Sequence, residues 1–167
     1  GKPSLRIEAR FLPAGPTVAD EMANSAFFLG LMMALPAEFG DVTESKLTFD
    51  DAKINFFSTA RYGLKSQLTW IDGKNYPARE LILEHLLPRA RRGLEMAKIE
   101  AADIEKYLGI LENRVMQAKT GSQWMLDSLA SMDKAAKSNV RLRTLTAAML
   151  KHQKKGEPLH EWSLAEI

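Results

Sequence analysis

The stretch Thr17–Leu35, TVADEMANSAFFLGLMMAL, decides the class of fold. Thr17 fits a helix N-cap, and Asp20 three residues later completes an acidic variant of the capping box. We expect a helix from about Val18 to Leu35 that ends at Pro36, because the residue before a proline avoids helical backbone. A helix that is apolar nearly all round is typical of a protein core. One face of this helix carries the apolar residues Met22, Ala26, Leu29 and Met33. Much of the remaining surface is also apolar and carries Phe27, Phe28, Leu31 and Met32.

The residues before this helix, Ser4–Pro16 or SLRIEARFLPAGP, alternate with a period of two. This pattern predicts a half-buried β-strand. Its polar face would carry charged side chains about 7 Å apart, and one carboxylate between two guanidinium groups could bind a metal ion and a phosphate together. A solvated face with cross-strand ion pairs is the alternative interpretation. Apolar Leu5, Ile7, Ala9 and Phe11 alternate with charged Arg6, Glu8 and Arg10.

A single strand cannot satisfy its own backbone groups and needs neighbours. The chain begins with Gly1 rather than Met, and it offers only one other weak strand candidate. We therefore expect the partner strands upstream in a longer polypeptide, or on another subunit.

Downstream, helical spacing returns after a second capping signal at Thr48-Phe49-Asp50-Asp51 and continues to about Leu64. Its apolar positions are Phe49, Ala52, Phe56, Phe57 and Ala60. Residues 67–76 predict a hairpin around an Asp72-Gly73 turn. The next helix should begin at Pro77, and Pro88 should break or kink it.

Three further helices and a tail complete the prediction. The first covers 102–119, and Thr120–Gln123 closes it and caps a second helix that should point Trp124, Leu126, Leu129 and Met132 inward. The last helix ends at Lys154-Lys155-Gly156. A tail from Pro158 contains His160 and Trp162, which are close enough in the sequence to form a functional site. A docked tail with a mostly structural role is the favoured interpretation.

The pattern as a whole predicts a mainly α protein with one N-terminal β-strand and a short hairpin, an α+β arrangement in one domain or a C-terminal fragment. Residues 1–16 would form an active-site strand and turn, 17–155 a helical region with the hairpin at 67–76, and 156–167 the tail.

Composition narrows the function classes. The 167 residues hold 23 Lys and Arg against 21 Asp and Glu, a balance that argues against a dedicated nucleic-acid module. Arg89, Arg91 and Arg92 form a small basic cluster that could touch phosphate, although a solvated helix face is favoured. The 167 residues contain no cysteine, and no signal peptide is visible in them. The longest apolar run, Ala26–Leu35, is too short to span a bilayer, so we expect a cytoplasmic protein without a membrane partner.

Six segments in order resemble the C-terminal part of glutamate–cysteine ligases, the ATP-dependent enzymes that make γ-glutamylcysteine in glutathione biosynthesis. The likeness is to the plant and proteobacterial type and to bacterial ligase-like relatives. RIEARFLPAGPT resembles the family's Glu-x-Arg strand and the turn that follows it. The other segments are AFFLGLMMAL, YGLKSQLTWIDG, ARRGLE with the helix after it, KTGSQW, and the tail from Pro158 to Leu164.

The resemblance implies the helical portion of a glutamine-synthetase-like ligase fold. It also implies a metal role for Glu8, as a Mg²⁺ ligand, and a catalytic and ATP-binding role for Arg10, at the nucleotide phosphate. These roles suit the side chains, because Mg²⁺ prefers carboxylates plus phosphate oxygens and a guanidinium stabilises a transferring phosphoryl group. The implied substrates are glutamate and an amine such as cysteine.

Two departures from the family limit this expectation. Its other metal carboxylates and its glutamate pocket lie on strands N-terminal to this segment, so residues 1–167 alone should be inactive. Ala9 stands where relatives often carry a larger residue, so the amine acceptor could differ from cysteine. A non-catalytic helical interaction module derived from the ligase fold is the alternative function. A nucleic-acid binder using Arg89, Arg91 and Arg92 is a third, and it requires strongly salt-dependent binding.

Overall fold

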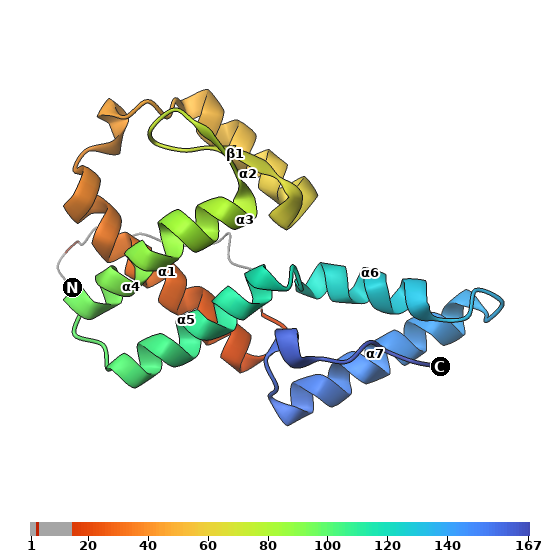
Figure 1. The fold of residues 1–167 in the computed structure, drawn as a ribbon. Helices are drawn as coiled ribbons and strands as arrows, with labels where there is room; N and C mark the ends of the chain where they lie inside the picture. The colour runs from red at the N-terminus through yellow and green to blue at the C-terminus, as the bar shows by residue number, and fades with distance from the viewer. Residues whose placement is uncertain (1–2, 4–14) are drawn as a thin grey trace.

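The computed structural model describes residue 3 and residues 15–167, and in that part the chain is mainly helical with a two-stranded antiparallel sheet (Figure 1). The predicted strand at residues 4–11 lies outside the described residues. In chain order the elements are α1 (Val18–Phe39), α2 (Phe49–Tyr62), β1 (Gln67–Thr69), β2 (Asn75–Pro77), α3 (Ala78–Glu80), α4 (Leu87–Met96), α5 (Ala101–Met116), α6 (Gly121–Ser131) and α7 (Ser138–Lys155). Short 3-10 turns lie at Val42–Glu44, Gly63–Lys65 and Leu159–Glu161, and a π-helical segment lies at Leu81–Leu86.

Helix α1 begins at the predicted cap, where the backbone N–H of Asp20 donates to the Thr17 hydroxyl at 3.2 Å. The predicted end at Pro36 is wrong, because the helix continues through this proline to Phe39. Pro36 is exposed, so its ring lies at the solvent side of the last turns. Gly40 ends the helix instead: its φ of 61° is left-handed and its N–H donates to the carbonyl of Pro36 at 3.0 Å.

Helix α1 crosses α4 so closely that the backbones touch. A Cβ added at Gly93 would lie 1.8 Å from the carbonyl oxygen of Gly30, and one added at Gly30 would lie 2.3 Å from the carbonyl oxygen of Ala90. Only glycine fits at this crossing. The main apolar core forms around it, from Ala23, Leu87, Ala90, Leu94, Ile104, Leu108, Ile110, Leu111 and Val115.

The prediction that α1 is buried all round is wrong for one face. Ala23, Gly30 and Ala34 are buried, whereas Met22 and Leu29 are about half exposed, at 45% and 56%. The small residues face α4 because they allow the close crossing, and the large ones face outward. By length and composition alone α1 could cross a membrane, a criterion that core helices of soluble proteins also meet. The cytoplasmic location stays a prediction.

Helix α2 has the predicted cap, a complete capping box in which Thr48 and Asp51 bond each other's backbone N–H. Its apolar side faces outward, and no residue of this helix is buried. The polar side faces the hairpin instead, where Asn55 accepts from the Thr69 N–H at 2.9 Å and donates to the Thr69 carbonyl at 2.7 Å. This side chain therefore pairs with β1 as a neighbouring strand would.

The hairpin is confirmed at the predicted place, with Leu68 paired to Tyr76 and Gln67 to Pro77. The helical run that follows does not break at Pro88. The chain instead widens into the π-helix, in which the N–H of Leu87 donates to the carbonyl of Ile82, five residues back. Pro88 has no N–H to donate and its ring would clash with a carbonyl four residues earlier, so the wider turn accommodates it.

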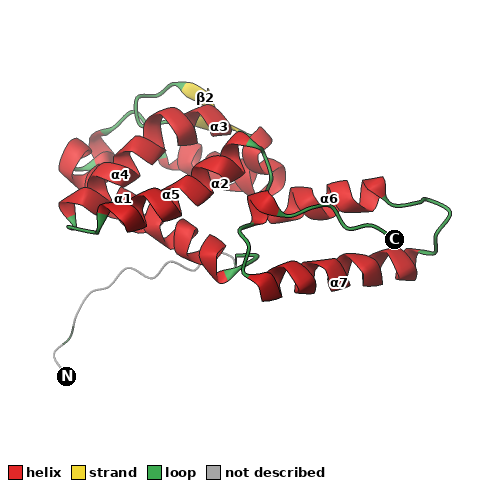
Figure 2. Cartoon of the chain, turned by 60° about the horizontal axis from the view of Figure 1, so that its bottom comes forward, coloured by secondary structure: helices red, strands yellow, loops and turns green. Residues whose placement is uncertain are grey.

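Helices α6 and α7 extend beside the main body, and the C-terminal segment runs between them (Figure 2). The predicted Thr120 cap is confirmed, because the backbone N–H of Gln123 donates to the Thr120 hydroxyl at 3.2 Å. Trp124 and Met132 point inward as predicted, but Leu126 is 61% exposed, so its expected inward direction is wrong. A second apolar core joins these helices to the tail through Trp124, Met132, Leu145, Leu159, Trp162 and Ala165.

Candidate functional site

The two predicted site residues, Glu8 and Arg10, lie outside the described residues. The described part of the chain that follows them begins at Gly15, at its junction with the first turn of α1. A side chain on Gly15 would meet the backbone nitrogen of Glu21 at 2.8 Å, so the chain passes close to the first turn just before it enters the helix.

Asp20 forms a buried polar cluster directly below this junction. Its carboxylate is 0% exposed, and it accepts from the Thr17 hydroxyl at 2.8 Å and from the Arg114 guanidinium at 2.7 Å. Arg114 comes from the end of α5, and it also donates to the Asn24 side chain at 2.6 Å. A buried charge pair with this many hydrogen bonds fixes its partners firmly.

The same carboxylate holds the C-terminal tail. The backbone N–H of Leu159 lies 3.1 and 3.3 Å from the two Asp20 carboxylate oxygens. One buried side chain thus joins the start of α1, the end of α5 and a segment 139 residues away. The start of α1, to which the segment with the predicted site residues is attached, is thus held by hydrogen bonds to two distant parts of the chain.

The tail is docked, as the favoured interpretation predicted. Lys119 donates to the carbonyls of His160 and Trp162, and burial lowers the pKa of this lysine below its ordinary value. The Trp124 ring N–H donates to the Ser163 carbonyl at 2.8 Å, and the Trp162 ring N–H to the Glu157 carbonyl at 2.7 Å. These groups are used in holding the tail against α6 and α7.

His160 and Trp162 do not converge on one site. Trp162 is 2% exposed and stacks on His152, with ring centres 4.9 Å apart and planes 13° apart. His152 also approaches the Glu157 carboxylate at 3.4 Å. The buried Nδ1 of His160 instead has no hydrogen-bond partner among the described residues, and its Nε2 lies 3.7 Å from Glu161. Trp162 belongs to the second core, and the His152 ring stacks against it.

The basic cluster is paired with carboxylates. The carboxylate of Glu38, at the end of α1, forms ion pairs with the guanidinium groups of Arg89 at 2.7 Å and Arg92 at 2.5 Å. Arg91 forms an ion pair with Glu105 of α5. The hydrogen bond from Arg89, helped by the charge of Arg92, lowers the pKa of Glu38 below its ordinary value despite partial desolvation. The three guanidinium groups bridge α4 to α1 and α5, so the expected solvated face is wrong for Arg89, whose side chain is only 18% exposed.

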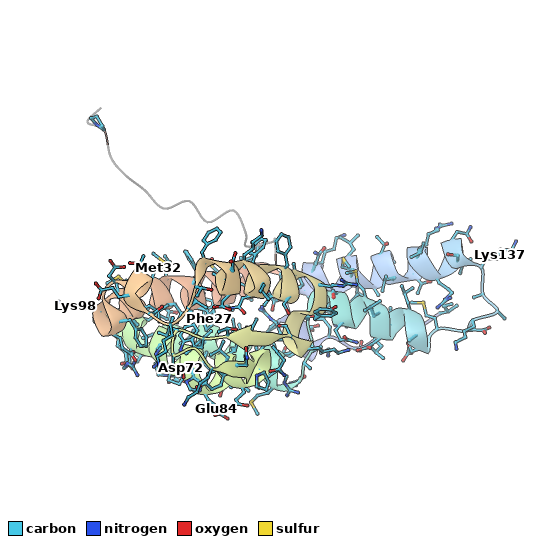
Figure 3. The ribbon with its side chains drawn as sticks, turned by 90° about the horizontal axis from the view of Figure 1, so that it is seen from above. Phe27, Met32, Asp72, Glu84, Lys98 and Lys137 are labelled. Carbon is cyan, nitrogen blue, oxygen red and sulfur yellow. The ribbon has the colours of Figure 1, made fainter. Side chains whose placement is uncertain are left out.

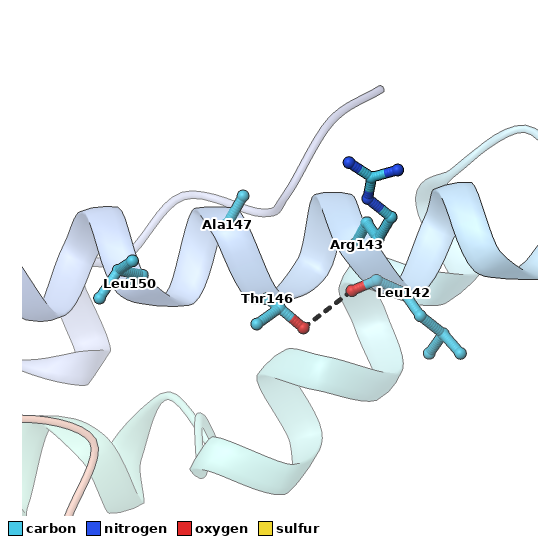
Figure 4. A pocket seen from close by; sticks show the side chains of 5 residues that line it. All are labelled: Leu142, Arg143, Thr146, Ala147 and Leu150. Atoms are coloured by element: carbon cyan, nitrogen blue, oxygen red, sulfur yellow. Dashed lines mark hydrogen bonds between the residues drawn. The ribbon is translucent and has the colours of Figure 1, made fainter.

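The described surface offers shallow hollows. One lies on the outer side of α7 between Leu142, Arg143, Thr146, Ala147 and Leu150, where the Thr146 hydroxyl already donates to the Leu142 carbonyl at 2.9 Å (Figure 4). A second lies where α7 meets the tail, near His152 and Ser163. Among residues 3 and 15–167, no group of three or more acidic, histidine or cysteine side chains could hold a metal ion.

Sequence reasoning missed the wider role of Asp20. Asp20 and Glu21 are adjacent acidic residues in the first turn of a mainly apolar helix, and the sequence pattern assigns Asp20 only to the cap. Its partner Arg114 is 94 residues away and gives no local signal. Asn55 was missed in the same way, although it is the polar residue between Ile54 and Phe56 on an aromatic helix.

Comparison with protein-family models, curated proteins and solved structures finds no match to this chain. The resemblance to glutamate–cysteine ligases therefore stands on the sequence motifs alone. The roles of Glu8 and Arg10, the ATP and Mg²⁺ requirement and the substrates remain proposals.

Proposed function

We propose that this chain is the C-terminal region of an ATP- and Mg²⁺-dependent carboxylate–amine ligase, similar to glutamate–cysteine ligase. The observation that carries the proposal is the alternating strand pattern at Arg6–Phe11, followed in order by the five other segments that resemble the family. The reaction would convert the carboxylate of glutamate into an acyl phosphate, which an amine then attacks. The fold beyond its mainly helical class, that of a glutamine-synthetase-like ligase, belongs to the same proposal.

The chemistry of the two side chains fits these ligands. Glu8 would supply one hard oxygen ligand to Mg²⁺, which takes a few carboxylates and completes its shell with phosphate oxygens and water. Arg10 would hold the nucleotide phosphate through its fixed fork of N–H donors and stabilise charge there. Mg²⁺ bound with ATP would neutralise the phosphate oxygens. The remaining carboxylate ligands and the glutamate pocket would come from strands outside this chain, upstream in the same polypeptide or on another subunit.

The described residues support the proposal indirectly. A residue that orients a phosphate must itself be held in place, and the segment that carries Glu8 and Arg10 joins the helices within a few residues of Asp20. That carboxylate is fully buried and bonded to three separate parts of the chain. The strand would thus start from a rigid base.

The test compares two substitutions on the same predicted strand in the full-length protein. Glu8→Ala should abolish Mg²⁺-dependent turnover while the far-ultraviolet circular dichroism of the helices is unchanged. Arg6→Ala is the matched control, because Arg6 carries no family role, and it should retain turnover. Normal turnover by Glu8→Ala would show that Glu8 is not a metal ligand.

A non-catalytic helical interaction module is the second candidate function. The observation that favours it is the large apolar surface that α1 and α2 expose, with Leu29 at 56% and Phe57 at 62%. Monomeric soluble proteins rarely expose large contiguous apolar patches unless they bind a partner. The natural reading frame before Gly1 distinguishes the two functions: strands with inward-facing carboxylates support the ligase, and a natural start near Gly1 supports the module.

A further inference from the structure

The outer face of α7 carries apolar side chains that the fold does not use. Helices α6 and α7 form an arm that extends from the main body, with Lys137 at its far end (Figure 3). The inner face of α7 packs into the second core through Leu145 and Ala148. On the outer face Leu142 is 50% exposed and Leu150 is 51% exposed, and neither belongs to an apolar core of the described chain. Packing within the described residues therefore does not explain these two leucines.

Helix α7 is also positively charged along its length. It contains five Lys and Arg and no Asp or Glu. Arg141 donates to a backbone carbonyl of α6. Lys155 pairs with Glu157 at 3.3 Å. Lys151 lines the second hollow together with Glu166 of the tail. The chain thus supplies polar neighbours for three of the five cations.

The other two cations, Arg143 and Lys154, lie at the ends of one row on the outer face. The row consists of Arg143, Ala147, Leu150 and Lys154, at intervals of four, three and four residues, so its members lie on one side of the helix. All four are exposed. Neither cation has a carboxylate partner among the residues that the structure describes. The row therefore carries positive charge at both ends and uncharged side chains between them.

The shallow hollow on α7 lies along this row. Its lining consists of Leu142, Arg143, Thr146, Ala147 and Leu150. Figure 4 shows Arg143 and Ala147 on one side of the helix and Leu142 and Thr146 on the other. Residues at positions i, i+3, i+4 and i+7 form the hole that receives one side chain of a facing helix, and residues 143, 146, 147 and 150 have this spacing. The Thr146 hydroxyl already donates to the Leu142 carbonyl at 2.9 Å, so an apolar side chain can enter without leaving this hydroxyl unpaired.

We propose that the outer face of α7 binds an acidic amphipathic helix of a partner protein. One apolar side chain of that helix would enter the hollow beside Leu142 and Leu150. Carboxylates before and after it would pair with Arg143 and Lys154, which are separated by about 16 Å along α7, or about three turns. Charged residues beside an apolar seam select the partner and its orientation. The binding is independent of the ligase function, because no residue of the row belongs to the proposed catalytic site.

Charge and composition favour this partner over three others. A second copy that presented its own α7 would oppose cations with cations, which disfavours the contact. Aromatic residues are enriched where proteins meet the membrane–water interface, whereas α7 contains no Phe, Trp or Tyr. Nucleic acid would pair its phosphates with the cations but leave Leu142 and Leu150 in water. An acidic amphipathic helix supplies partners for both the cations and the leucines.

The binding test uses the full-length protein and two synthetic helical peptides. Both peptides repeat Leu at intervals of three and four residues, and the flanking positions carry Glu in one peptide and Lys in the other. Fluorescence anisotropy of the labelled peptides gives the two dissociation constants. We expect the Glu peptide to bind the wild type at least roughly tenfold more tightly than the Lys peptide, a difference of about 1.4 kcal/mol. Equal binding of the two peptides, or no saturable binding of the Glu peptide, would overturn the proposal.

Reversing the two unpaired cations gives a sharper comparison. Arg143→Glu with Lys154→Glu should weaken binding of the Glu peptide roughly tenfold and tighten binding of the Lys peptide. Lys53→Glu with Arg61→Glu on α2 is the matched control, because it changes the net charge equally and should keep the wild-type preference. If both double variants lost the Glu peptide to the same extent, binding would depend on net charge rather than on α7, and the proposal would be refuted.

A second set of variants tests the apolar part of the contact. Leu142→Ser with Leu150→Ser should weaken binding of the Glu peptide, whereas Leu126→Ser on α6, at a position 61% exposed, should not. All these substitutions are at exposed positions, so the far-ultraviolet circular dichroism should match that of the wild type. Unchanged binding by the double leucine variant would contradict an apolar side chain in the hollow.

Two further probes distinguish the other classes of partner. Anionic lipid vesicles or duplex DNA that bound through Arg143 and Lys154, while the Glu peptide did not bind, would assign the surface to a membrane or to nucleic acid and overturn the proposal. Glu8→Ala should leave peptide binding unchanged, so a failure of the ligase function is distinguishable from a failure of this binding.

Discussion

Replacing Gly93 with Ala tests the crossing on which the fold depends. The added Cβ would lie 1.8 Å from the carbonyl oxygen of Gly30, where ordinary contact begins at 3.4 Å, so the two helices would have to separate by about 1.6 Å, the difference between these distances. Overpacking of this kind costs about 1–3 kcal/mol, and we expect the upper end because both contacting groups are backbone. The better helix propensity of alanine offsets about 1 kcal/mol of this loss in the free energy of unfolding. The net loss in the free energy of unfolding should be about 2 kcal/mol.

Urea unfolding followed by far-ultraviolet circular dichroism measures this loss. Gly109→Ala is the matched control, because nothing lies within 4 Å of the Cβ it would add. Alanine in a helix interior with open space around its Cβ should stabilise that variant by up to about 1 kcal/mol. If Gly93→Ala were as stable as Gly109→Ala, α1 and α4 would not cross in contact at these residues, and the arrangement of the main core would be refuted.

Three further predictions concern the charged groups. Asp20→Ala should lower the free energy of unfolding by about 3–5 kcal/mol in urea unfolding, because it leaves Arg114 buried beside a lost partner; a loss under 1 kcal/mol would contradict the role of the buried cluster. Glu38 has a folded pKa below its ordinary value of 4.5, so its pair with Arg89 stabilises the fold above that value, and this stability disappears as the pH falls through the folded pKa. The wild type should be more stable than Glu38→Gln by at most about 1 kcal/mol at neutral pH. This difference in the free energy of unfolding should shrink as the pH falls from 7 to 3. A difference that grows would contradict the stabilising role of the Glu38 pair. Lys119→Ala should speed hydrogen exchange in residues 159–165 by releasing the tail, and unchanged exchange there would show that the lysine does not hold it.

The helix caps could be predicted from the sequence because their bonds are local. Thr17, Thr48 and Thr120 each accept from a backbone N–H three residues later, and all three caps were expected. The hairpin was predictable for the same reason, since its turn carries the Asp72-Gly73 signal. Interactions that span three to six residues leave a pattern that a single sequence displays.

The faces of the helices could not be predicted as reliably. Along α1 almost every position is apolar, so the pattern does not distinguish the side with Gly30, which contacts α4, from the side with Leu29, which is exposed. On α2 the spacing of the aromatic residues predicts a helix but not which face packs, and the contact with the hairpin is made by Asn55. Which face packs depends on a partner far along the chain, and in α1 on the small residues rather than the large ones.

The candidate site depends even more on distant groups. Asp20 meets Arg114 and Leu159 only in the folded chain, across 94 and 139 residues. The roles of Glu8 and Arg10 are implied by the resemblance to glutamate–cysteine ligases, and they stay predictions because both residues lie outside the described residues.

The central claim is the ligase function, and one assay tests it most directly. ADP release by the full-length protein would be followed with ATP, Mg²⁺ and glutamate against a panel of amines that includes cysteine. The proposal predicts ADP release that requires both Mg²⁺ and an amine, and none from residues 1–167 alone. Turnover by the 167-residue chain alone would contradict the expectation that its catalytic partners lie elsewhere, and no amine-dependent turnover by the full-length protein would contradict the ligase function itself.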